Sequence, residues 1–213
     1  MFEHLYDLLM SDVDYEAILN QIEPYLNEYD FIIDAGCGSG YLLIELLKRH
    51  YQAIGLDLST SMLAIAKDKM IEEKVMTDLY EHDLRKKIYA QADVILAMFD
   101  VMNYFKGIKG VLRNIYQALY PKGRFIFDVY KEEILSVYDG YVEDESDPTN
   151  YTWKIHVKDN RIDHMITHKH QTDTIRQYVH PLKDYLDYLD ELGFEVEIKE
   201  SIDPRKHLII ATK

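Results

Sequence analysis

The 213-residue chain has few residues that form disulfides or interrupt regular secondary structure, with one cysteine, five prolines and nine glycines. A single cysteine, Cys37, cannot form a disulfide within the chain, so we expect a cytoplasmic protein. Uninterrupted apolar runs of the roughly 20 residues that a membrane-spanning helix needs are also missing. The first residues, MFEHLYDLLMSDVDY, are acidic where a secretory signal is basic, so we expect neither export nor a membrane partner.

Basic residues are scarce as well, because 24 lysines and arginines face 38 aspartates and glutamates, a formal net charge of −14. Proteins bind nucleic acids mainly by neutralising phosphates, so this balance disfavours a broad nucleic-acid surface. An acidic net charge is still compatible with a local basic patch that binds nucleic acid. The hydrophobic share of 47% is ordinary for a globular protein, and the length suits one domain with an elaboration.

Helical and strand-like apolar patterns alternate through residues 1–132. Helical spacing in residues 2–29 is interrupted at Ser11 and at Pro24. After that, short apolar runs predict strands and longer amphipathic segments predict helices. The expected strands are 31–35, 52–57, 75–82, 92–98 and 123–130, and the expected helices are 41–50, 60–73 and 111–119. This order predicts βαβ units and hence a doubly wound, Rossmann-like α/β fold.

The pattern changes in the second half of the chain. Residues 139–150, DGYVEDESDPTN, predict an acidic surface loop. Period-2 alternation then predicts an antiparallel meander, with strands at 151–157, 161–171 and 174–180 and turns at 159–160 and 172–173. A helix from Pro181 to Leu192, ended by Gly193, and strands at 194–201 and 207–212 follow. We expect a core of residues 1–132 and 181–213 and an insertion of residues 133–180.

A glycine-rich segment, DAGCGSG from Asp34 to Gly40, leaves the first strand of the core and enters a helix. Glycines permit a tight turn and let a ligand lie against the backbone, and ligands of open α/β sheets bind where strands of this kind end. Nicotinamide enzymes space such a loop as G-x-G-x-x-G. Here the third glycine comes one residue too early and an acid precedes the loop, so a nicotinamide cofactor is disfavoured.

Two further acids end the next two strands. The carboxylate of Asp57 is able to accept the hydroxyl hydrogens of an adenosine ribose. The alternative is that it caps the next helix, a role that Ser59 can fill. Asp83 is able to accept from an adenine amino group, and its alternative is an ordinary loop acid.

These segments together resemble class I S-adenosylmethionine-dependent methyltransferases, whose landmarks match DAGCGSG, then GLDLS at 55–59, HDL at 82–84 and LYPKG at 119–123. The segment MFDVMNYF at 98–105 is similar to a bacterial small-molecule-type subgroup. That subgroup has a Tyr-Asp-containing N-terminal helix and an antiparallel sheet inserted before the last helix. The resemblance implies a seven-stranded sheet whose last strand is antiparallel, S-adenosyl-L-methionine as cofactor, and an insertion that covers the acceptor site.

The resemblance also implies the cofactor contacts. Asp34 and Gly36 are expected at the methionine portion, and Met98 and Phe99 beside the transferring methyl group. The complete set, including the ribose and adenine residues and the two tyrosines of the N-terminal cover, is Tyr6, Tyr15, Asp34, Gly36, Gly38, Asp57, Leu58, Asp83, Leu84, Met98 and Phe99. The alternative for Tyr6 and Tyr15 is helix packing.

Methyl transfer from a sulfonium is an in-line displacement that mainly requires positioning, and a base is needed only where the acceptor must lose a proton. We therefore name no catalytic residue. Asp100 and Asn103 are candidates for holding the acceptor, with local capping as the alternative. Cys37, inside the glycine loop, is poorly placed as a covalent nucleophile. The expected activity is methylation of an O or N atom of a small molecule; RNA or protein methylation and a non-catalytic regulatory role are the alternatives.

Histidines concentrate late in the chain. His164, His168 and His170 share one face of a predicted strand. They are candidates for lining an acceptor pocket, for acting as a base or for binding a metal, and a solvated sheet face is the alternative. We predict no metal site.

Overall fold

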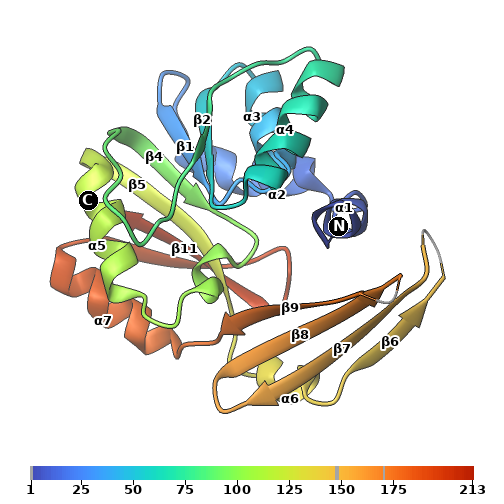
Figure 1. Ribbon diagram of the computed structural model, residues 1–213. Coiled ribbons are helices and arrows are strands. Elements are labelled where there is room, and N and C mark those ends of the chain that lie inside the picture. The colour runs from blue at the N-terminus through green and yellow to red at the C-terminus, as the bar shows by residue number, and fades with distance from the viewer. Residues whose placement is uncertain (1, 147–148, 170) are drawn as a thin grey trace.

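The computed structural model describes residues 2–146, 149–169 and 171–213. It contains a seven-stranded sheet with helices on both faces and a four-stranded antiparallel sheet beside it (Figure 1). The large sheet has the strand order β10-β11-β5-β4-β1-β2-β3. Its strands are β1 (Phe31–Ala35), β2 (Gln52–Asp57), β3 (Leu79–Glu81), β4 (Ala92–Ala97), β5 (Leu119–Tyr130), β10 (Glu195–Glu200) and β11 (Lys206–Thr212). Strand β11 runs antiparallel to β5 and β10, so the predicted doubly wound sheet with an antiparallel last strand is confirmed.

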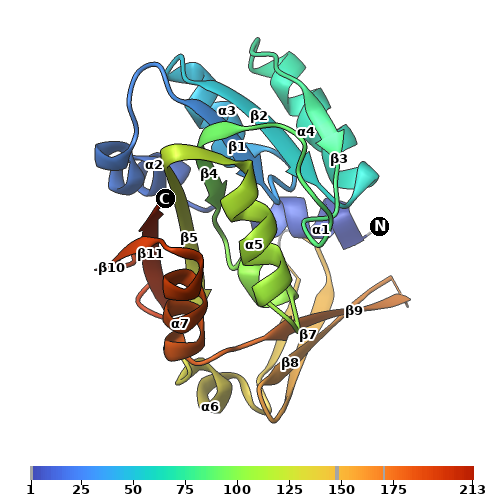
Figure 2. The same cartoon turned by 90° about the vertical axis from the view of Figure 1, so that its left-hand side faces the viewer.

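Two groups of helices cover the two faces of this sheet (Figure 2). One face carries α5 (Lys109–Ala118) and α7 (Leu182–Leu192). The other carries α2 (Tyr15–Ile22), α3 (Tyr41–Lys48) and α4 (Thr60–Glu72). The remaining helical segments are α1 (Phe2–Leu9) and the 3₁₀ turns η1 (Glu23–Tyr25) and η2 (Val101–Tyr104). Because both faces are buried, the central strands are mostly apolar, which is why short apolar runs predicted them.

Local sequence signals set several helix ends. The Ser59 hydroxyl accepts from the Met62 amide at the start of α4, as expected for an N-cap. At the end of α7, Gly193 adopts φ 90°, a left-handed conformation that glycine takes without strain. No helix in the part of the chain that the structure describes is long and apolar enough to cross a membrane.

Two core strands differ in length from their predictions. Strand β3 covers only Leu79–Glu81, because residues 75–78 run as irregular chain after α4. Strand β5 begins at Leu119, before Pro121, where a strand was not expected. Its pairing with β4 shifts register between Ala92 and Val94, so the proline falls at an irregularity where it displaces no regular ladder.

The segment 133–180 forms the second sheet and one short helix. These are α6 (Ile134–Tyr138), β6 (Val142–Glu145), β7 (Tyr151–Lys158), β8 (Arg161–His168) and β9 (Gln171–Tyr178), with the strands in sequence order. The loop expected over 139–150 is wrong in part, because Val142–Glu145 pairs with β7 as an edge strand. The turn expected at 172–173 is also wrong, since Thr172 pairs with Thr167 inside the β8–β9 ladder. The chain reverses instead between His168 and Gln171, which pair with each other, and Lys169 has a positive φ.

The inserted sheet packs against the core at the end where β1 and β4 finish (Figure 1). Tyr130 at the end of β5 packs with Ile155, Ile162 and Val179 of the insertion. On the other side, Leu5 of α1 packs with Tyr151 and Ile166. Helix α1 therefore lies between the core and the inserted sheet, above the ends of the strands.

Candidate active site

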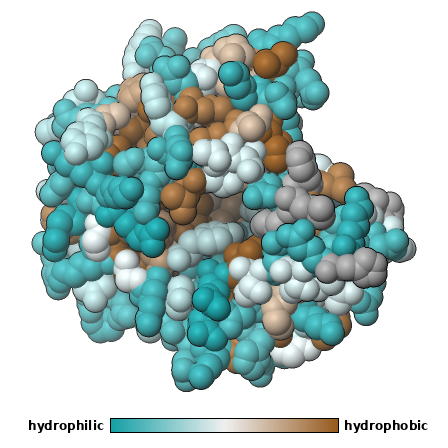
Figure 3. Space-filling model, in the orientation of Figure 1, coloured by the Kyte–Doolittle hydropathy of each residue, from teal (hydrophilic) through white to brown (hydrophobic). Residues whose placement is uncertain are grey.

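A cavity of about 510 Å³ lies where the carboxyl ends of the core strands, α1, η2 and β9 meet. Figure 3 shows a hollow with apolar side chains on this face, between the core and the inserted sheet. The expected cofactor residues that line the cavity are Tyr6, Tyr15, Asp34, Gly36, Gly38, Asp57, Leu58, Asp83, Leu84 and Phe99. Residues from distant parts of the chain thus reach one space, as the motif order predicted.

The glycine loop follows β1 and forms the floor of the cavity. The backbone amides of Gly36 and Cys37 donate to the Leu56 carbonyl at 2.7 and 3.0 Å, which holds the loop against β2. Gly36 has φ 84°, and a Cβ added there would lie 2.6 Å from Cγ2 of Val101. At Gly38, with φ 54°, an added Cβ would meet nothing within 4 Å. Position 36 therefore requires glycine for the approach of η2, and position 38 leaves a bare backbone facing the cavity.

Asp57 connects this loop to the start of α4. One carboxylate oxygen accepts from the Gly38 amide and the other from the Ser59 amide, both at 2.8 Å. Burial raises the pKa of Asp57, and the backbone hydrogen bonds oppose that rise. Each carboxylate oxygen retains lone-pair capacity for a further donor. Since Ser59 supplies the helix cap, the Asp57 carboxylate remains available to a ligand on its cavity side.

Asp34 is a buried acid at the bottom of the cavity. Its Oδ2 atom is buried without a hydrogen-bond partner among the described residues. Burial, with the nearby negative charge of Asp57, raises the pKa of Asp34 to about 7. A buried carboxylate oxygen left unpaired is costly unless a ligand supplies a donor or a cation. Burial also raises the pKa of the Cys37 thiol, so that side chain is a poor nucleophile, as expected.

The ionisable groups of the cavity wall are mostly acidic. Besides Asp34 and Asp57, the wall contains Glu3 and Asp83, against a single arginine, Arg85. Arg85 is itself paired with Asp83, because its Nε and Nη2 atoms lie 2.9 and 2.8 Å from the two carboxylate oxygens. This pairing lowers the pKa of Asp83. The cavity consequently has a net negative charge.

Aromatic rings form the wall opposite the acids. Tyr15 stacks on Tyr41 with ring centres 4.7 Å apart, and Phe99 lies 5.2 Å from Tyr15. Tyr6, Tyr104 and Phe105 also line the space. Electron-rich ring faces of this kind favour a cationic group such as a sulfonium.

Helix α1, which closes the cavity, is attached to the core by polar contacts. Lys69 of α4 forms an ion pair with Asp7, and its ammonium lies 3.2 Å from the centre of the Tyr41 ring. The Tyr41 hydroxyl donates to the Asp7 carbonyl at 3.3 Å. These contacts place Glu3, Tyr6 and Met10 of the N-terminal segment over the opening.

The three site candidates Met98, Asp100 and Asn103 of the 98–105 segment lie outside the cavity wall. Met98 is buried in the core. The Asn103 amide is fully buried and structural: it donates to the Tyr178 carbonyl at 2.9 Å and accepts from the Tyr130 amide at 3.1 Å. Asp100 is bound by internal partners, of which Lys206 Nζ lies 2.5 Å away. These contacts differ from the local capping stated as the alternative for Asp100 and Asn103, because the partners are distant in the chain and the Asp100 side chain makes no capping bond to η2.

Besides the predicted Phe99, three residues of this segment reach the cavity that were not predicted. They are Val101, Tyr104 and Phe105. Residues three apart share a face of a 3₁₀ helix, so Val101 and Tyr104 point one way while Asn103 points another. The aromatic pair in NYF was the available sequence signal. Ile175 of β9, which also lines the cavity, had none.

Two of the late histidines have protein partners. No group of three or more metal-ligating side chains occurs among residues that the structure describes. His164 is buried and bonded to Gln177, with Nε2 and Oε1 2.9 Å apart. The Nδ1 atom of His168 lies 2.8 Å from the Asn150 carbonyl, and His170 lies outside the described residues.

Comparison with known proteins identifies the fold and the family of this site. The family model "Methyltransferase domain" matches residues 32–123, which include the glycine loop, Asp57 and Asp83. Residues 32–123 belong to this family of methyltransferase domains, and the enzyme is a S-adenosylmethionine-dependent methyltransferase. A Bacillus subtilis protein named "Putative methyltransferase YqeM" is 27% identical to this methyltransferase over 212 residues, covering 92% of this chain and 85% of its own length.

Solved structures share the fold of this methyltransferase over nearly its whole length. A S-adenosylmethionine-dependent methyltransferase from Clostridium acetobutylicum has a TM-score of 0.83 at 22% identity, covering 99% of this chain and 97% of that one. The sugar N-methyltransferase KedS8 from a Streptoalloteichus species has a TM-score of 0.81 at 17% identity, covering 100% and 92%. At these identities the likeness concerns the fold, including the inserted sheet.

Proposed function

We propose that this methyltransferase methylates a nitrogen or oxygen atom of a small molecule that binds between η2, α1 and β9. The observation that carries the proposal is the division of one cavity into two parts. We define its inner part by the bare glycine backbone and the acids Asp34 and Asp57, and its outer part by Val101, Tyr104, Phe105 and Ile175. A cavity of about 510 Å³ has the size of small-molecule sites.

We assign the inner part to S-adenosylmethionine, which supplies an activated sulfonium methyl group when bound. The unpaired oxygen of Asp34 suits the ammonium of the methionine portion, next to Gly36. Asp57 suits the ribose hydroxyls. Asp83, oriented by Arg85, suits the adenine amino group together with the Leu84 backbone. The remaining proposed contacts are Tyr6, Tyr15, Gly38, Leu58 and Phe99, all of which line the cavity.

Met98 is the one expected cofactor contact that the cavity wall does not support. Its side chain is buried in the core behind Phe99. We keep Phe99 as the residue beside the transferring methyl group. Its ring, with that of Tyr15, excludes water from the reacting atoms.

We further propose that the acceptor is neutral or cationic. The cavity wall has four acids and one arginine, which is paired, so an anionic acceptor would be repelled. An amine meets this requirement, and the structural neighbour KedS8 is described as a sugar N-methyltransferase. The same charge disfavours RNA, which binds through its phosphates. In this proposal residues 133–180 cover the acceptor site, and the enzyme works in the cytoplasm.

Calorimetric titration tests the cofactor part of the proposal. We expect micromolar binding of S-adenosylmethionine and S-adenosylhomocysteine and no binding of NADH. Absence of binding to a folded protein would remove the proposal. The acceptor part is tested with methyl-tritiated S-adenosylmethionine and a bacterial extract separated into small-molecule, protein and RNA fractions. Label in the small-molecule fraction supports the proposal, and label only in protein or RNA contradicts it.

A further inference from the structure

The backbone beside the aromatic wall is strained at one step. Phe99 and Asp100 adopt φ 62° and 55°, two consecutive left-handed residues of which neither is glycine. Such residues are strained and persist only where the surroundings hold them. The Phe99 side chain lines the cavity, and η2 with Val101 and Tyr104 follows directly. The conformation of this step therefore sets the position of the wall that faces the acceptor.

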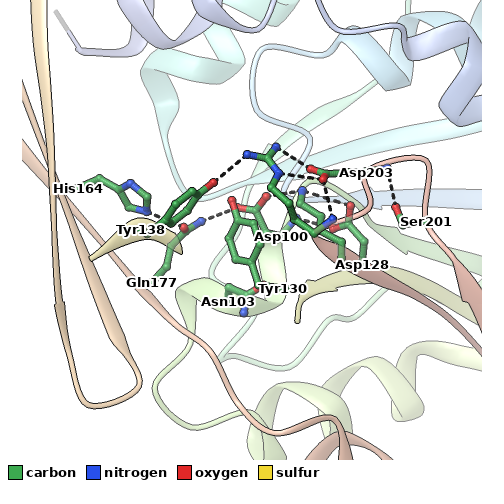
Figure 4. Close-up of polar contacts among 11 residues, drawn as sticks. Asp100, Asn103, Asp128, Tyr130, Tyr138, His164, Gln177, Ser201 and Asp203 are labelled. Atoms are coloured by element: carbon green, nitrogen blue, oxygen red, sulfur yellow. Dashed lines mark hydrogen bonds and ion pairs between the residues drawn. The ribbon is translucent and has the colours of Figure 1, made fainter. Parts of the chain in front are cut away.

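Three side chains hold the turn formed by Phe99 and Asp100 (Figure 4). Lys206 of β11 binds one carboxylate oxygen of Asp100 at 2.5 Å and lies 3.4 Å from Asp128 of β5. Asp128 accepts from the Asp100 backbone amide. The other carboxylate oxygen of Asp100 accepts from the Nε2 atom of Gln177, which belongs to the inserted sheet. Residues of the core and of the insertion thus bind the same turn at Asp100.

Only one of the two possible orientations of the Gln177 amide satisfies both of its partners. The ionised carboxylate of Asp100 only accepts hydrogen bonds, so the amide nitrogen must face it. The amide oxygen then faces Nε2 of His164, 2.9 Å away, which must donate. The Nδ1 atom of His164 accepts from the Trp153 indole at 3.3 Å. Burial lowers the pKa of His164, which keeps the imidazole in the neutral form that this directed chain requires.

Gln177 also reaches the cavity wall itself. Its side-chain amide lies close enough to the phenol of Tyr104, which lines the cavity, to oppose the rise in pKa that burial causes in that phenol. Gln177 is only 4% exposed, so its amide groups are satisfied by these internal partners and not by water. The buried Gln177 amide therefore lies beside both ends of the segment from Asp100 to Tyr104.

We propose that Gln177 is a positioning residue for methyl transfer, which holds the Phe99–Asp100 turn and the Tyr104 phenol in the arrangement that receives the acceptor. The inference rests on the proposed function for its catalytic consequence, but its geometric part is independent of any acceptor. The inserted sheet then has two roles, because it covers the site and fixes the wall of the core.

The test replaces Gln177 with methionine, which keeps the length of the side chain and removes both hydrogen-bonding groups. The matched control is Gln171→Met, the same exchange in the same strand at an exposed position. Position 99 is labelled with 4-fluorophenylalanine, and its ¹⁹F resonance is recorded with S-adenosylhomocysteine bound. We expect Gln177→Met to shift or broaden this resonance and Gln171→Met to leave it unchanged.

Kinetics complete the test. In Gln177→Met we expect the rate of tritium transfer to the small-molecule fraction to fall by about tenfold or more, and S-adenosylhomocysteine affinity to stay within about threefold. An unchanged Phe99 resonance would overturn the inference, whatever the rate. If the wild type transfers no methyl group, the proposed function fails, and the resonance still decides whether Gln177 positions the turn.

A second variant, Gln177→Glu, keeps the acceptor for His164 and loses only the donor to Asp100. The titratable groups that face position 177 are Asp100 and Tyr104 from the core and His164 from β8, with Lys206 behind Asp100. Two adjacent carboxylates cannot both ionise at low cost, so the pair retains a proton to higher pH than usual. We expect the ratio of variant to wild-type transfer, and the wild-type-like Phe99 resonance, to recover as pH falls. A ratio and a resonance that do not change with pH would contradict the inference.

Discussion

Lys206 lies between two carboxylates in the interior of the protein, 2.5 Å from Asp100 and 3.4 Å from Asp128. Its ammonium joins β11 to the turn after β4, although the residues are 106 positions apart in the chain. The two acids and one base leave a buried net negative charge beside the cavity. Removing the lysine would leave both carboxylates without a counter-ion.

The variant Lys206→Met is therefore expected to be destabilised by about 3–5 kcal/mol, the usual cost of breaking a buried ion pair. The unpaired carboxylates would bind protons more tightly in the folded than in the unfolded state. Stability of the variant should then rise as pH falls from 8 towards 5. Urea unfolding at several pH values measures this, with Lys131→Met, which loses only a partly exposed pair with Glu200, as the control.

The substitution Asp34→Asn is expected to raise the stability of the protein and to weaken cofactor binding. Burial raises the pKa of Asp34 to about 7, so the ionised acid opposes folding at higher pH and a neutral amide relieves that cost. The melting temperature of the ligand-free protein should rise, and S-adenosylhomocysteine affinity should fall by about tenfold or more through loss of the charge-assisted bond. Equal affinity of variant and wild type would disprove the ammonium role.

The same acid predicts the pH dependence of cofactor binding. A cationic ammonium binds the carboxylate form, which in the free protein predominates only above the pKa of about 7. Affinity for S-adenosylhomocysteine should be constant above that pH and weaken by up to about tenfold per pH unit below it. Calorimetry from pH 5.5 to 8.5 checks the slope, and Asp34→Asn should lack it.

Asp57→Ala is expected to weaken cofactor binding by about 1.5–3 kcal/mol, the range of hydrogen bonds to a charged group. Part of the loss has an indirect cause, because the Asp57 carboxylate also fixes the Gly38 and Ser59 amides. Ser59→Ala removes the helix cap and leaves Asp57 in place, so it serves as the comparison. If the two variants bind S-adenosylhomocysteine equally well, the ribose assignment is wrong.

Asn103→Leu is expected to lower stability and leave cofactor affinity unchanged. The substitution leaves the Tyr130 amide and the Tyr178 carbonyl without their partner, and each unsatisfied buried group costs about 1–3 kcal/mol. Chemical denaturation and calorimetry measure the two quantities. A variant of normal stability with impaired methyl transfer would instead favour the acceptor-holding role considered from the sequence.

Lys69→Met is expected to speed cofactor exchange. Its ion pair with Asp7 and its contact with the Tyr41 ring attach α1 over the cavity. Without them the helix should open more often, so the dissociation rate of S-adenosylhomocysteine in stopped-flow experiments should increase. Lys48→Met, which removes exposed pairs near the same helices, should leave that rate unchanged.

The parts of the molecule that the sequence predicted are those specified by neighbouring residues. Strand β1 was predicted with its observed bounds because an apolar run ends in glycines, and α7 because Pro181 and Gly193 mark its ends. The β8–β9 turn was misplaced because Thr172 is a good turn residue and also a good strand residue. Here pairing with Thr167 decides between the two.

The roles of Asp100 and Asn103 depended on contacts that no local pattern reveals. Asp100 bonds Lys206 and Gln177, and Asn103 bonds the Tyr178 carbonyl, all of which are distant in the chain. The left-handed step at Phe99 turns both side chains away from the cavity. The lysine at the start of β11 had no sequence signal for burial. Spacing along the chain located the functional segment correctly but not the direction in which its side chains point.

The inserted segment leaves the core after Tyr130 and returns at Val179, and these two residues pack in the same cluster. The two ends of the insertion are thus neighbours in space. The residues between them can therefore change without moving the core strands. A replacement would need to keep the two anchors at the end of β9, the Gln177 amide and the Tyr178 carbonyl. Ile175, two positions before, faces the cavity. If the proposed function holds, changes in residues 133–180 would alter acceptor choice while the cofactor contacts of the core stay the same.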